Sequence, residues 1–375
     1  MPVRALARVN LAAIERNCAR LRRELGDRAE LAAVVKADGY GHGAVPVARA
    51  ALAGGATWLA VATAREAAEL RAGGLDGRVL VMGALSHEEL PVALEAGAEV
   101  VAWREPFVAR LGQASGDQVA VHVKLDTGMG RLGTRDLDEA RRVVDAVADA
   151  DSLRLAGVMT HFATADEPGA DGGFFDAQLE RFSEFVEAVR ADHPGVIAHA
   201  ANSAATLRHP GAHFDLVRCG IAIYGMDPFH QDPAARELEP ALELRSYVAD
   251  LKPTGPGESA GYGRTFVAER PTVLGVLPIG YGDGWRRGLS NHAEALIGGR
   301  RVPLVGTFSM DNVTVDLGPD TGVAVGDSAV LIGADGAERI TAEDVARRLG
   351  TINYEVTCGL TARVPREYHR DGEAV

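Results

Sequence analysis

The first two thirds of the chain alternate between short apolar runs, rich in β-branched residues, and longer stretches of helical character. A repeat of roughly 20 to 40 residues of this kind is typical of consecutive βα units in a parallel sheet. Eight runs are present, and eight strands close a parallel barrel. The sequence therefore predicts an α/β fold that begins with a (β/α)8 TIM-type barrel. The runs occupy residues 31–35, 58–62, 79–82, 100–103, 119–125, 155–159, 196–200 and 216–223, and the helix-like stretches occupy 44–53, 64–72, 86–95, 137–148 and 174–190.

The pattern of apolar runs and turn residues changes near residues 237–244. Downstream, short strand-like runs are separated by glycine-rich turns, which predicts a second, mostly β domain. We expect the barrel over residues 1–238 and the β domain over residues 239–375. One helix is expected at 342–349, with Thr341 as its N-cap and Asp344 in its first turn. The expected strands are 242–251, 272–278, 293–297, 301–305, 312–317 and 327–332.

An open, doubly wound sheet is the alternative architecture. Residues 128–133 read Gly-Met-Gly-Arg-Leu-Gly and match the G-x-G-x-x-G dinucleotide pattern after a strand. Alone, that pattern is a weak signal. Here it follows the fifth expected strand instead of opening the fold, and Arg131 lies where a pyrophosphate would have to approach closely. We therefore favour the barrel.

Composition limits the classes of partner and the compartment. The chain of 375 residues has 39 basic and 52 acidic side chains, and its formal net charge of −13 argues against a nucleic-acid partner. No segment reaches membrane-spanning length, and no signal peptide is recognisable. The scattered Cys18, Cys219 and Cys358 indicate reduced thiols and lack metal-ligand spacing. We expect a cytoplasmic protein without a bound metal or a membrane partner.

Lys36 ends the first apolar run and precedes a glycine-rich loop. A lysine at the mouth of an apolar pocket loses hydration, so its neutral amine becomes accessible near pH 7, as a Schiff base with a carbonyl cofactor requires. Gly39, Gly41 and Gly43 allow a sharp turn and leave room for a bulky ligand, and Tyr40 brings a hydroxyl close by. The other interpretation is a surface lysine leaving a strand, which this segment alone slightly favours.

Polar residues follow several other expected strands. Because catalytic groups gather at the C-terminal ends of barrel strands, these residues should converge with Lys36 on one mouth. The N–H groups of Gly220 and Ile221, with the hydroxyl of Ser203, would form an anion site suited to a phosphate. Alternatively, Ser203 is merely a helix N-cap and His161 a hydrogen-bonded core histidine. The residues concerned are Asp126 to Arg131, Thr160 to Phe162, Asn202, Ser203 and Arg218 to Ile221.

Nine segments in order carry a resemblance to a known family. They include Val35-Lys36-Ala37-Asp38-Gly39-Tyr40-Gly41-His42-Gly43, Asp126-Thr127-Gly128-Met129-Gly130-Arg131-Leu132-Gly133, and residues 160–163, 201–204, 217–221, 261–264, 280–284, 309–311 and 353–355. Along essentially its whole length the chain resembles the alanine racemases, which are fold-type III pyridoxal-phosphate enzymes. The resemblance implies a homodimer with shared active sites that interconverts L-alanine and D-alanine, supplying D-alanine for cell-wall peptidoglycan.

The resemblance also implies two catalytic bases. Lys36 would hold pyridoxal 5'-phosphate as a Schiff base and act as one base, while Tyr262 from the other subunit would be the second. Bases on opposite faces of a planar substrate are what racemisation needs. A phenol with a pKa of about 10 is a poor base at neutral pH, so His161, linked to Arg218, would assist Tyr262. Arg218 would face the pyridine nitrogen and keep it unprotonated, which favours a racemase over a decarboxylase.

The remaining roles also come from the resemblance. The phosphate-binding positions are Tyr40, Ser203, Gly220, Ile221 and Tyr354. Arg131 would contact the substrate carboxylate and the cofactor phenolic oxygen, Met310 of the partner would offer an N–H to the carboxylate, and Asp311 would position that turn. Lys124 lies two residues before Asp126 on the same strand face, where the family carries a carbamylated lysine. A carbamate there would be an anion able to pair with Arg131.

Rival functions remain open at this point. One is a related racemase or decarboxylase of the same fold that acts on another amino acid; Arg218 and Tyr262 argue against the decarboxylase. Another is a non-catalytic pyridoxal-phosphate carrier, which would need only the barrel. The second domain, with Tyr262, argues against that alternative.

Overall fold

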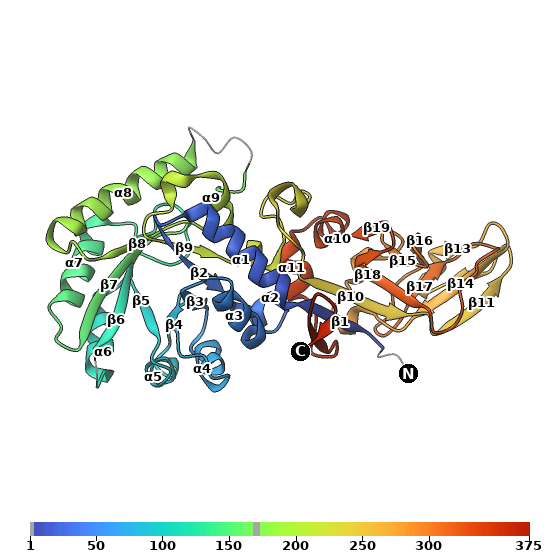
Figure 1. The fold of residues 1–375 in the computed structure, drawn as a ribbon, viewed down its shortest axis with the longest axis horizontal. Coiled ribbons are helices and arrows are strands. Elements are labelled where there is room, and N and C mark those ends of the chain that lie inside the picture. Colours follow the sequence, from blue (N-terminus) through green and yellow to red (C-terminus); the bar gives the residue numbers. More distant parts are fainter. Residues whose placement is uncertain (1–3, 117, 168–172) are drawn as a thin grey trace. The chain divides into compact units, whose positions relative to one another are not determined.

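A computed structural model describes residues 4–116, 118–167 and 173–375. The chain forms two compact units, one of Ile14–Ile223 and one of Met1–Ala13 with Tyr224–Val375 (Figure 1). This division differs from the expected one at residue 238, and it assigns the start of the chain to the second unit. The reason is a long-range pairing, because β1 (Leu6–Asn10) pairs antiparallel with β10 (Leu242–Tyr247) and parallel with β20 (Arg366–Arg370).

The first unit is the predicted barrel. Eight parallel strands pair in the order β8-β7-β6-β5-β4-β3-β2-β9. Its two end strands are joined by backbone hydrogen bonds, from the N–H of Asp215 to the carbonyl of Ala198 (3.1 Å) and from that of Arg218 to Ala201 (2.9 Å). The open doubly wound alternative is thereby excluded. The strands are β2 (Glu30–Val34), β3 (Trp58–Val61), β4 (Arg78–Val81), β5 (Glu99–Ala102), β6 (Val119–Lys124), β7 (Leu153–Met159), β8 (Ile197–His199) and β9 (Leu216–Cys219).

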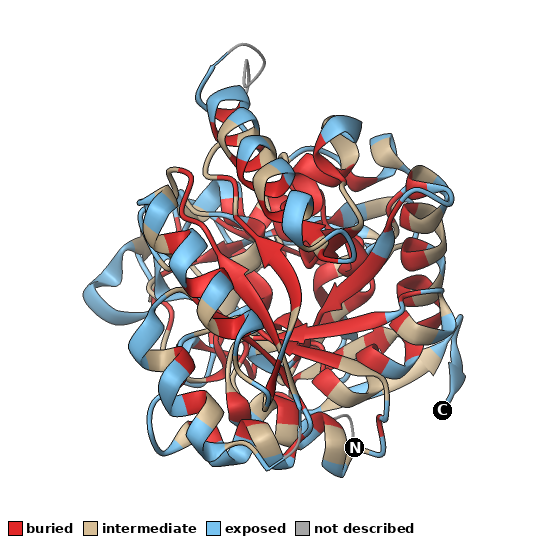
Figure 2. Ribbon diagram, turned by 90° about the vertical axis from the view of Figure 1, so that its left-hand side faces the viewer, coloured by how far each residue is buried: buried red, intermediate tan, exposed pale blue. Residues whose placement is uncertain are grey.

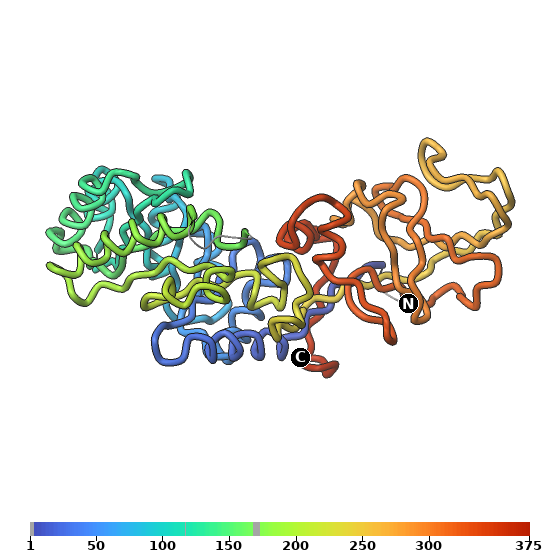
Figure 3. The backbone as a smooth tube through the Cα atoms, turned by 90° about the horizontal axis from the view of Figure 1, so that it is seen from above, coloured from blue at the N-terminus to red at the C-terminus, as the bar shows by residue number. Residues whose placement is uncertain are grey.

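Helices between the strands cover the barrel, and Figure 2 shows them buried toward the strands and exposed on the outside. In α7, Ala140, Val143, Val144 and Val147 are buried, the i, i+3, i+4, i+7 spacing of an amphipathic helix. The helical turns of this part of the chain can be followed along the tube in Figure 3. The helices of this part of the chain are α1 (Leu11–Leu25), α2 (Lys36–Tyr40), α3 (Ala44–Ala53), α4 (Ala64–Ala72), α5 (Glu89–Glu95), α6 (Glu105–Ala114), α7 (Leu137–Ala148), α8 (Phe174–Asp192) and α9 (Ser203–Arg208).

The second unit is mostly β, as predicted, with a large sheet in the order β11-β14-β17-β16-β15-β18-β10-β1-β20-β21 and a β12-β13 pair. The single strand predicted at 242–251 is wrong, because β10 pairs with β18 whereas β11 pairs with β14. Its other elements are β11 (Asp250–Thr254), β12 (Ser259–Ala260), β13 (Phe266–Val267), β14 (Thr272–Leu277), β15 (Glu294–Ile297), β16 (Arg300–Val305), β17 (Val313–Asp316), β18 (Ser328–Asp335), β19 (Glu338–Ile340), β21 (Glu373–Ala374), α10 (Ala342–Leu349) and α11 (Asn353–Cys358).

The helix predicted at 342–349 is confirmed as α10. The Oγ1 of Thr341 accepts from the N–H of Asp344 (3.2 Å), and an Asp344 carboxylate oxygen accepts from the N–H of Thr341 (3.0 Å). This reciprocal pair is a capping box, which satisfies two N–H groups that the helix itself cannot bond.

Candidate active site

Lys36 lies at the C-terminal end of β2, where the chain turns in an unusual conformation. Ala37, Asp38 and Tyr40 all have φ of 53°, and Gly39 between them has φ of 57°, so the backbone makes a left-handed turn. Each non-glycine residue in this region costs roughly 1–2 kcal/mol. Three of them within four residues therefore store strain directly after Lys36, and such strain concentrates at functional sites.

Glu66 from α4 stabilises this turn. One carboxylate oxygen accepts from the N–H of Ala37 (2.7 Å), and the other accepts from the N–H groups of Ala62 (2.8 Å) and Thr63 (3.0 Å). The carboxylate of Asp38 accepts from the N–H of Ala44 (3.0 Å) at the start of α3. Two carboxylates thus fix the loop that begins at Lys36 to the helices beside it.

The glycine-rich loop after β6 folds around Asp126. The carboxylate accepts from the N–H groups of Gly128 and Gly130 (both 3.0 Å) and from Arg135 (3.2 Å). Burial alone would raise the pKa of Asp126, but these hydrogen bonds hold it below its ordinary value. Gly133 must lack a side chain, because a Cβ there would lie 2.8 Å from the Asp126 nitrogen. The glycines therefore shape a loop that carries Arg131, and the resemblance to a dinucleotide fingerprint is coincidental.

Positive charge accumulates at the barrel mouth. Burial, followed by the charges of Arg218 and Arg131, lowers the pKa of the Lys124 ammonium to about 8, and Lys36 acts in the same direction. The carboxylate of Asp126 opposes this shift only in part. Four cationic side chains around one carboxylate make a site suited to an anionic ligand.

Arg218 on β9 binds groups at the C-terminal ends of β7 and β8. Its guanidinium donates to the carbonyls of Thr160 (2.7 Å) and Ala200 (3.0 Å) and to the Nδ1 atoms of His199 (2.9 Å) and His161 (3.3 Å). Burial, with the charges of Arg218 and Arg131, holds the pKa of His161 well below its ordinary value. His161 is therefore neutral at pH 7. Since arginine cannot accept a hydrogen bond, the imidazole proton lies on Nε2.

Ser203, Gly220 and Tyr40 lie together on the other side of the mouth. The Oγ of Ser203 accepts from the N–H groups of Gly220 (3.1 Å) and Ala222 (3.3 Å), and η2 (Ile221–Tyr224) begins between them at Ile221. A Cβ on Gly220 would lie 2.3 Å from the Tyr40 hydroxyl. Ser203 is not the N-cap of α9, because Asn202 fills that role by accepting from the N–H of Ala205 (3.0 Å).

Tyr262, Met310, Asp311 and Tyr354 belong to the second unit. Tyr262 in η4 (Tyr262–Arg264) is 71% exposed and Met310 is 51% exposed, high values for such large side chains. Asp311 is bound to Arg363 (2.6 Å), and its carbonyl accepts from Arg4 (2.9 Å). Both arginines also bind the buried Asp283, at 2.8 and 3.3 Å. The turn that carries Met310 is therefore held in place by ion pairs.

Two residues that position this site were missed by sequence reasoning. Gln178 on α8 is fully buried, and its amide bonds the Thr127 hydroxyl (3.1 Å), the His161 carbonyl (3.3 Å) and the Ala163 N–H (2.9 Å). Asp283 forms ion pairs with both Arg4 and Arg363 and so helps to hold the turn that carries Met310. The only sequence signal for Asp283 was its place in the segment 280–284, and Gln178 had none.

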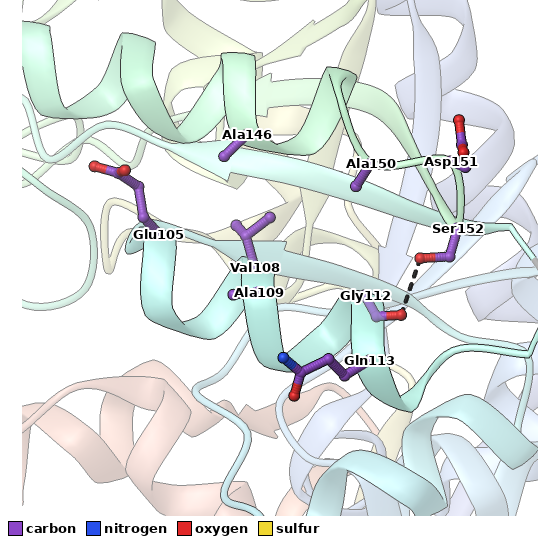
Figure 4. A pocket seen from close by; sticks show the side chains of 9 residues that line it. All are labelled: Glu105, Val108, Ala109, Gly112, Gln113, Ala146, Ala150, Asp151 and Ser152. Atoms are coloured by element: carbon purple, nitrogen blue, oxygen red, sulfur yellow. Dashed lines mark hydrogen bonds between the residues drawn. The ribbon is translucent and has the colours of Figure 1, made fainter.

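A separate cavity of about 490 Å³ lies between α6 and α7 (Figure 4). At one end the Ser152 hydroxyl donates to the Gly112 carbonyl (3.0 Å). Ser152 lies at the N-terminal side of β7, and in barrels of this type that face serves stability. The cavity is therefore not part of the candidate site.

Two kinds of feature are absent from the residues that the structure describes. No group of three or more histidine, cysteine, aspartate or glutamate side chains in these ranges is placed to hold a metal ion. Within the same ranges, every helix is too short or too polar to cross a membrane.

Comparison with known proteins gives consistent matches over both units. Residues 9–228 match the family model "Alanine racemase, N-terminal domain", and residues 241–368 match "Alanine racemase, C-terminal domain". The alanine racemase of Halalkalibacterium halodurans is 42% identical over 98% of this chain and 95% of its own length. The alanine racemase structure from Streptomyces lavendulae superposes with a TM-score of 0.92 at 38% identity, covering 98% of both chains. That of Bacillus anthracis with bound L-Ala-P gives 0.91 at 37% identity, covering 100% of this chain and 97% of that one.

Proposed function

The chain belongs to the alanine racemase family of isomerases, and we propose that it interconverts L-alanine and D-alanine with pyridoxal 5'-phosphate in a two-base reaction. The observation that carries the proposal is the mouth of the barrel, where Lys36 shares one site with Arg218, His161 and the Ser203 hydroxyl. In the cell, D-alanine made in the cytoplasm would supply peptidoglycan synthesis.

The residues at the mouth fit the cofactor. The cationic side chains at the mouth outnumber the carboxylates, and this excess of positive charge suits a phosphate and a substrate carboxylate. Two backbone N–H groups, from Gly220 and Ala222, point at the buried Ser203 hydroxyl. The missing Cβ of Gly220 leaves room beside the Tyr40 hydroxyl. Tyr40, Ser203, Gly220 and Ile221 would hold the phosphate together with Tyr354.

When the substrate amine replaces the lysine at the cofactor's aldehyde carbon, this cofactor would acidify the α-hydrogen of the amino acid by accepting electron density, and the released lysine amine would be free to act as a base. Lys36 would hold the cofactor, and this role is supported by the strained turn and Glu66, which fix the backbone at the start of its side chain. Arg218 would donate to the ring nitrogen. A permanent cation there keeps that nitrogen unprotonated, which limits electron withdrawal and hence side reactions such as transamination.

Proton exchange needs groups on both faces of the substrate. Lys36 would serve one face and the partner subunit's Tyr262 the other. The neutral His161, with its proton on Nε2, is able to donate to the Tyr262 oxygen. A donor at that atom stabilises the phenolate and makes tyrosine a stronger base near neutral pH. The exposure of Tyr262 and Met310 on the second unit supports their insertion into another chain's site.

The substrate carboxylate would meet Arg131 and the N–H of the partner subunit's Met310. The ion pairs of Asp311 with Arg363 and Arg4 support this role, because they hold the Met310 turn in place. Such a clamp orients the α-carbon between the two bases and contributes through positioning.

The direct test of the function is racemisation of a panel of amino acids by the purified enzyme with pyridoxal phosphate, followed by chiral chromatography. We expect alanine to be racemised fastest, from both enantiomers. Preference for a larger amino acid, or release of carbon dioxide, would contradict the proposal in favour of a related racemase or decarboxylase.

We further propose that Lys124 carries a carbamate. Only a neutral amine adds carbon dioxide, and a pKa of about 8 makes that form far more common near neutral pH than in an ordinary lysine. The addition releases one proton and converts a cation beside Arg131 into an anion, which relieves like-charge repulsion.

With 13C-labelled bicarbonate, the protein should show a carbamate carbon resonance in NMR spectra. The signal should vanish in Lys124→Ala and persist in Lys252→Ala, which removes an exposed lysine paired with Asp250. A spectrum without that resonance, or a resonance that survives Lys124→Ala, would refute the carbamate.

A further inference from the structure

A row of hydrogen-bonded side chains crosses the barrel interior and ends at Arg218. A Glu99 carboxylate oxygen at the start of β5 lies 2.9 Å from His122 Nε2. His122 Nδ1 lies 2.8 Å from His199 Nε2, and His199 Nδ1 lies 2.9 Å from the Arg218 guanidinium. The row joins four different strands, β5, β6, β8 and β9.

The row permits a single arrangement of protons. Because arginine only donates, the Nδ1 of His199 must accept, and its proton lies on Nε2. His122 must then accept at Nδ1 and carry its own proton on Nε2, which it donates to Glu99. Every bond is satisfied with both imidazoles neutral and Glu99 ionised.

The electrostatics agree with this arrangement. Burial lowers the pKa of both His122 and His199, which keeps the imidazoles neutral. Burial alone would raise the pKa of Glu99, but hydrogen bonds from His122 and Arg78 lower it to about 2. The row therefore has a positive charge at Arg218 and a negative charge at Glu99, with two neutral rings between them.

The far end of the row is firmly fixed. Arg78 binds Glu99 through two hydrogen bonds, of 2.6 and 3.1 Å, and its guanidinium lies 3.4 Å from the Trp58 ring centroid. Gly157 on β7 makes room for His122, since a Cβ there would come within 2.3 Å of His122 Nδ1.

Stability alone does not explain these residues. Barrel interiors are usually filled by valine, isoleucine and leucine. Here Glu99 is 8% exposed and both histidines are fully buried, although well-packed apolar residues of similar volume would be as stabilising. Among the described residues, Arg218 donates to carbonyls and to neutral imidazoles. Glu99 is therefore connected to the Arg218 guanidinium only through this row.

We propose that Glu99 and His122 are positioning residues for Arg218: they lock His199 in the tautomer that accepts from the guanidinium, and so hold that guanidinium toward the cofactor ring nitrogen. The orientation toward the ring rests on the proposed function. The locked tautomers do not, so the two claims fail separately.

The first experiment uses the unmodified, cofactor-free protein with 15N-labelled histidine, of which the chain has 11. NMR should show His122 and His199 as neutral rings protonated at Nε2, with resonances assigned from single histidine variants. A His199 ring that is protonated at Nδ1, or doubly protonated, would overturn the proposal whatever reaction the enzyme catalyses.

The second experiment compares the Glu99→Gln and Glu105→Gln holoenzymes. One carboxylate oxygen of Glu99 accepts from Arg78, and the other accepts from both Arg78 and His122, so the NH2 group of a glutamine at 99 opposes a donor in either orientation. A buried, unpaired donor should lower kcat roughly tenfold or more. The KM for alanine should stay within about twofold, because neither residue touches substrate.

Glu105 is the matched control, since it pairs with Arg142 on the surface. Its variant should keep the wild-type kcat. An unchanged kcat in a folded Glu99→Gln enzyme would overturn the positioning role. If that variant does not fold, the tautomer measurement on the unmodified protein still decides the proposal.

Discussion

Lys36→Ala is expected to abolish racemisation, with a loss of at least roughly 10,000-fold, because one substitution removes both the covalent anchor and one base. The absorbance of the enzyme-bound cofactor should disappear with the activity. Spectra and chiral assays of the purified variant would measure both effects.

Because the chain has few lysines, the experiment can identify which one holds the cofactor. The chain contains only Lys36, Lys124 and Lys252. Borohydride reduction of the wild-type holoenzyme should fix the cofactor to the peptide containing Lys36 and to neither of the others. Lys252→Ala, at an exposed lysine, should retain full activity and the full spectrum. Racemisation by Lys36→Ala, or cofactor trapped on Lys124, would contradict the assigned anchor.

Tyr262→Phe should leave the cofactor bound and slow racemisation by roughly 100- to 10,000-fold, the usual contribution of a general base. A catalyst cannot change the equilibrium between the enantiomers, so the diagnostic result lies in hydrogen exchange. In deuterium oxide, Lys36 should still exchange the α-hydrogen of one enantiomer, without inverting it. Mass spectrometry and chiral chromatography would measure exchange and inversion separately.

Tyr247→Phe, on β10, is the matched control and should racemise and exchange like the wild type. Equal exchange of both enantiomers in Tyr262→Phe, or inversion that keeps pace with exchange, would exclude Tyr262 as the second base.

The barrel could be predicted because parallel strands covered by helices are buried on both faces. Such strands consist of continuous apolar runs that stand out from the amphipathic helices between them. The predicted helices at 44–53, 64–72 and 137–148 coincide with α3, α4 and α7. Capping residues explain this agreement at α4 and α7, where Thr63 and Asp136 accept from the first-turn N–H groups.

Long-range pairing could not be predicted in the same way. β1 is a short run whose partners lie more than 200 residues away, in β10 and β20. Nothing local in residues 6–10 distinguishes a strand of the second unit from a strand of the barrel. Only its pairing within the complete sheet shows that β1 belongs to the second unit.

The strained turn after Lys36 could be predicted from the sequence only in part. Gly39, Gly41 and Gly43 indicated a sharp turn, but Ala37, Asp38 and Tyr40 also have positive φ. Ordinary side chains avoid that region, so no local rule predicts them there. The conformation depends on acceptors from elsewhere in the fold, above all Glu66 on α4.

The row of hydrogen bonds from Glu99 to Arg218 could not be predicted from the sequence for a related reason. Glu99 and His122 lie in strands where a polar residue would ordinarily face solvent, and the sequence does not show which face is inside. Glu99 meets His122 from β6, 23 positions along the chain, and His122 meets His199 from β8, 77 positions further on. Polar groups that work together in a barrel are brought together only by its closure.

Hybrid dimers test the shared, two-base site most directly. A Lys36→Ala subunit and a Tyr262→Phe subunit, each with a different affinity tag, are co-expressed and purified in tandem. In a twofold dimer with shared sites, one site then contains both substitutions and the other contains neither. The hybrid should recover about half of the wild-type activity, from two nearly inactive parents. A hybrid as inactive as its parents would show that Lys36 and Tyr262 act within one chain and would contradict the account.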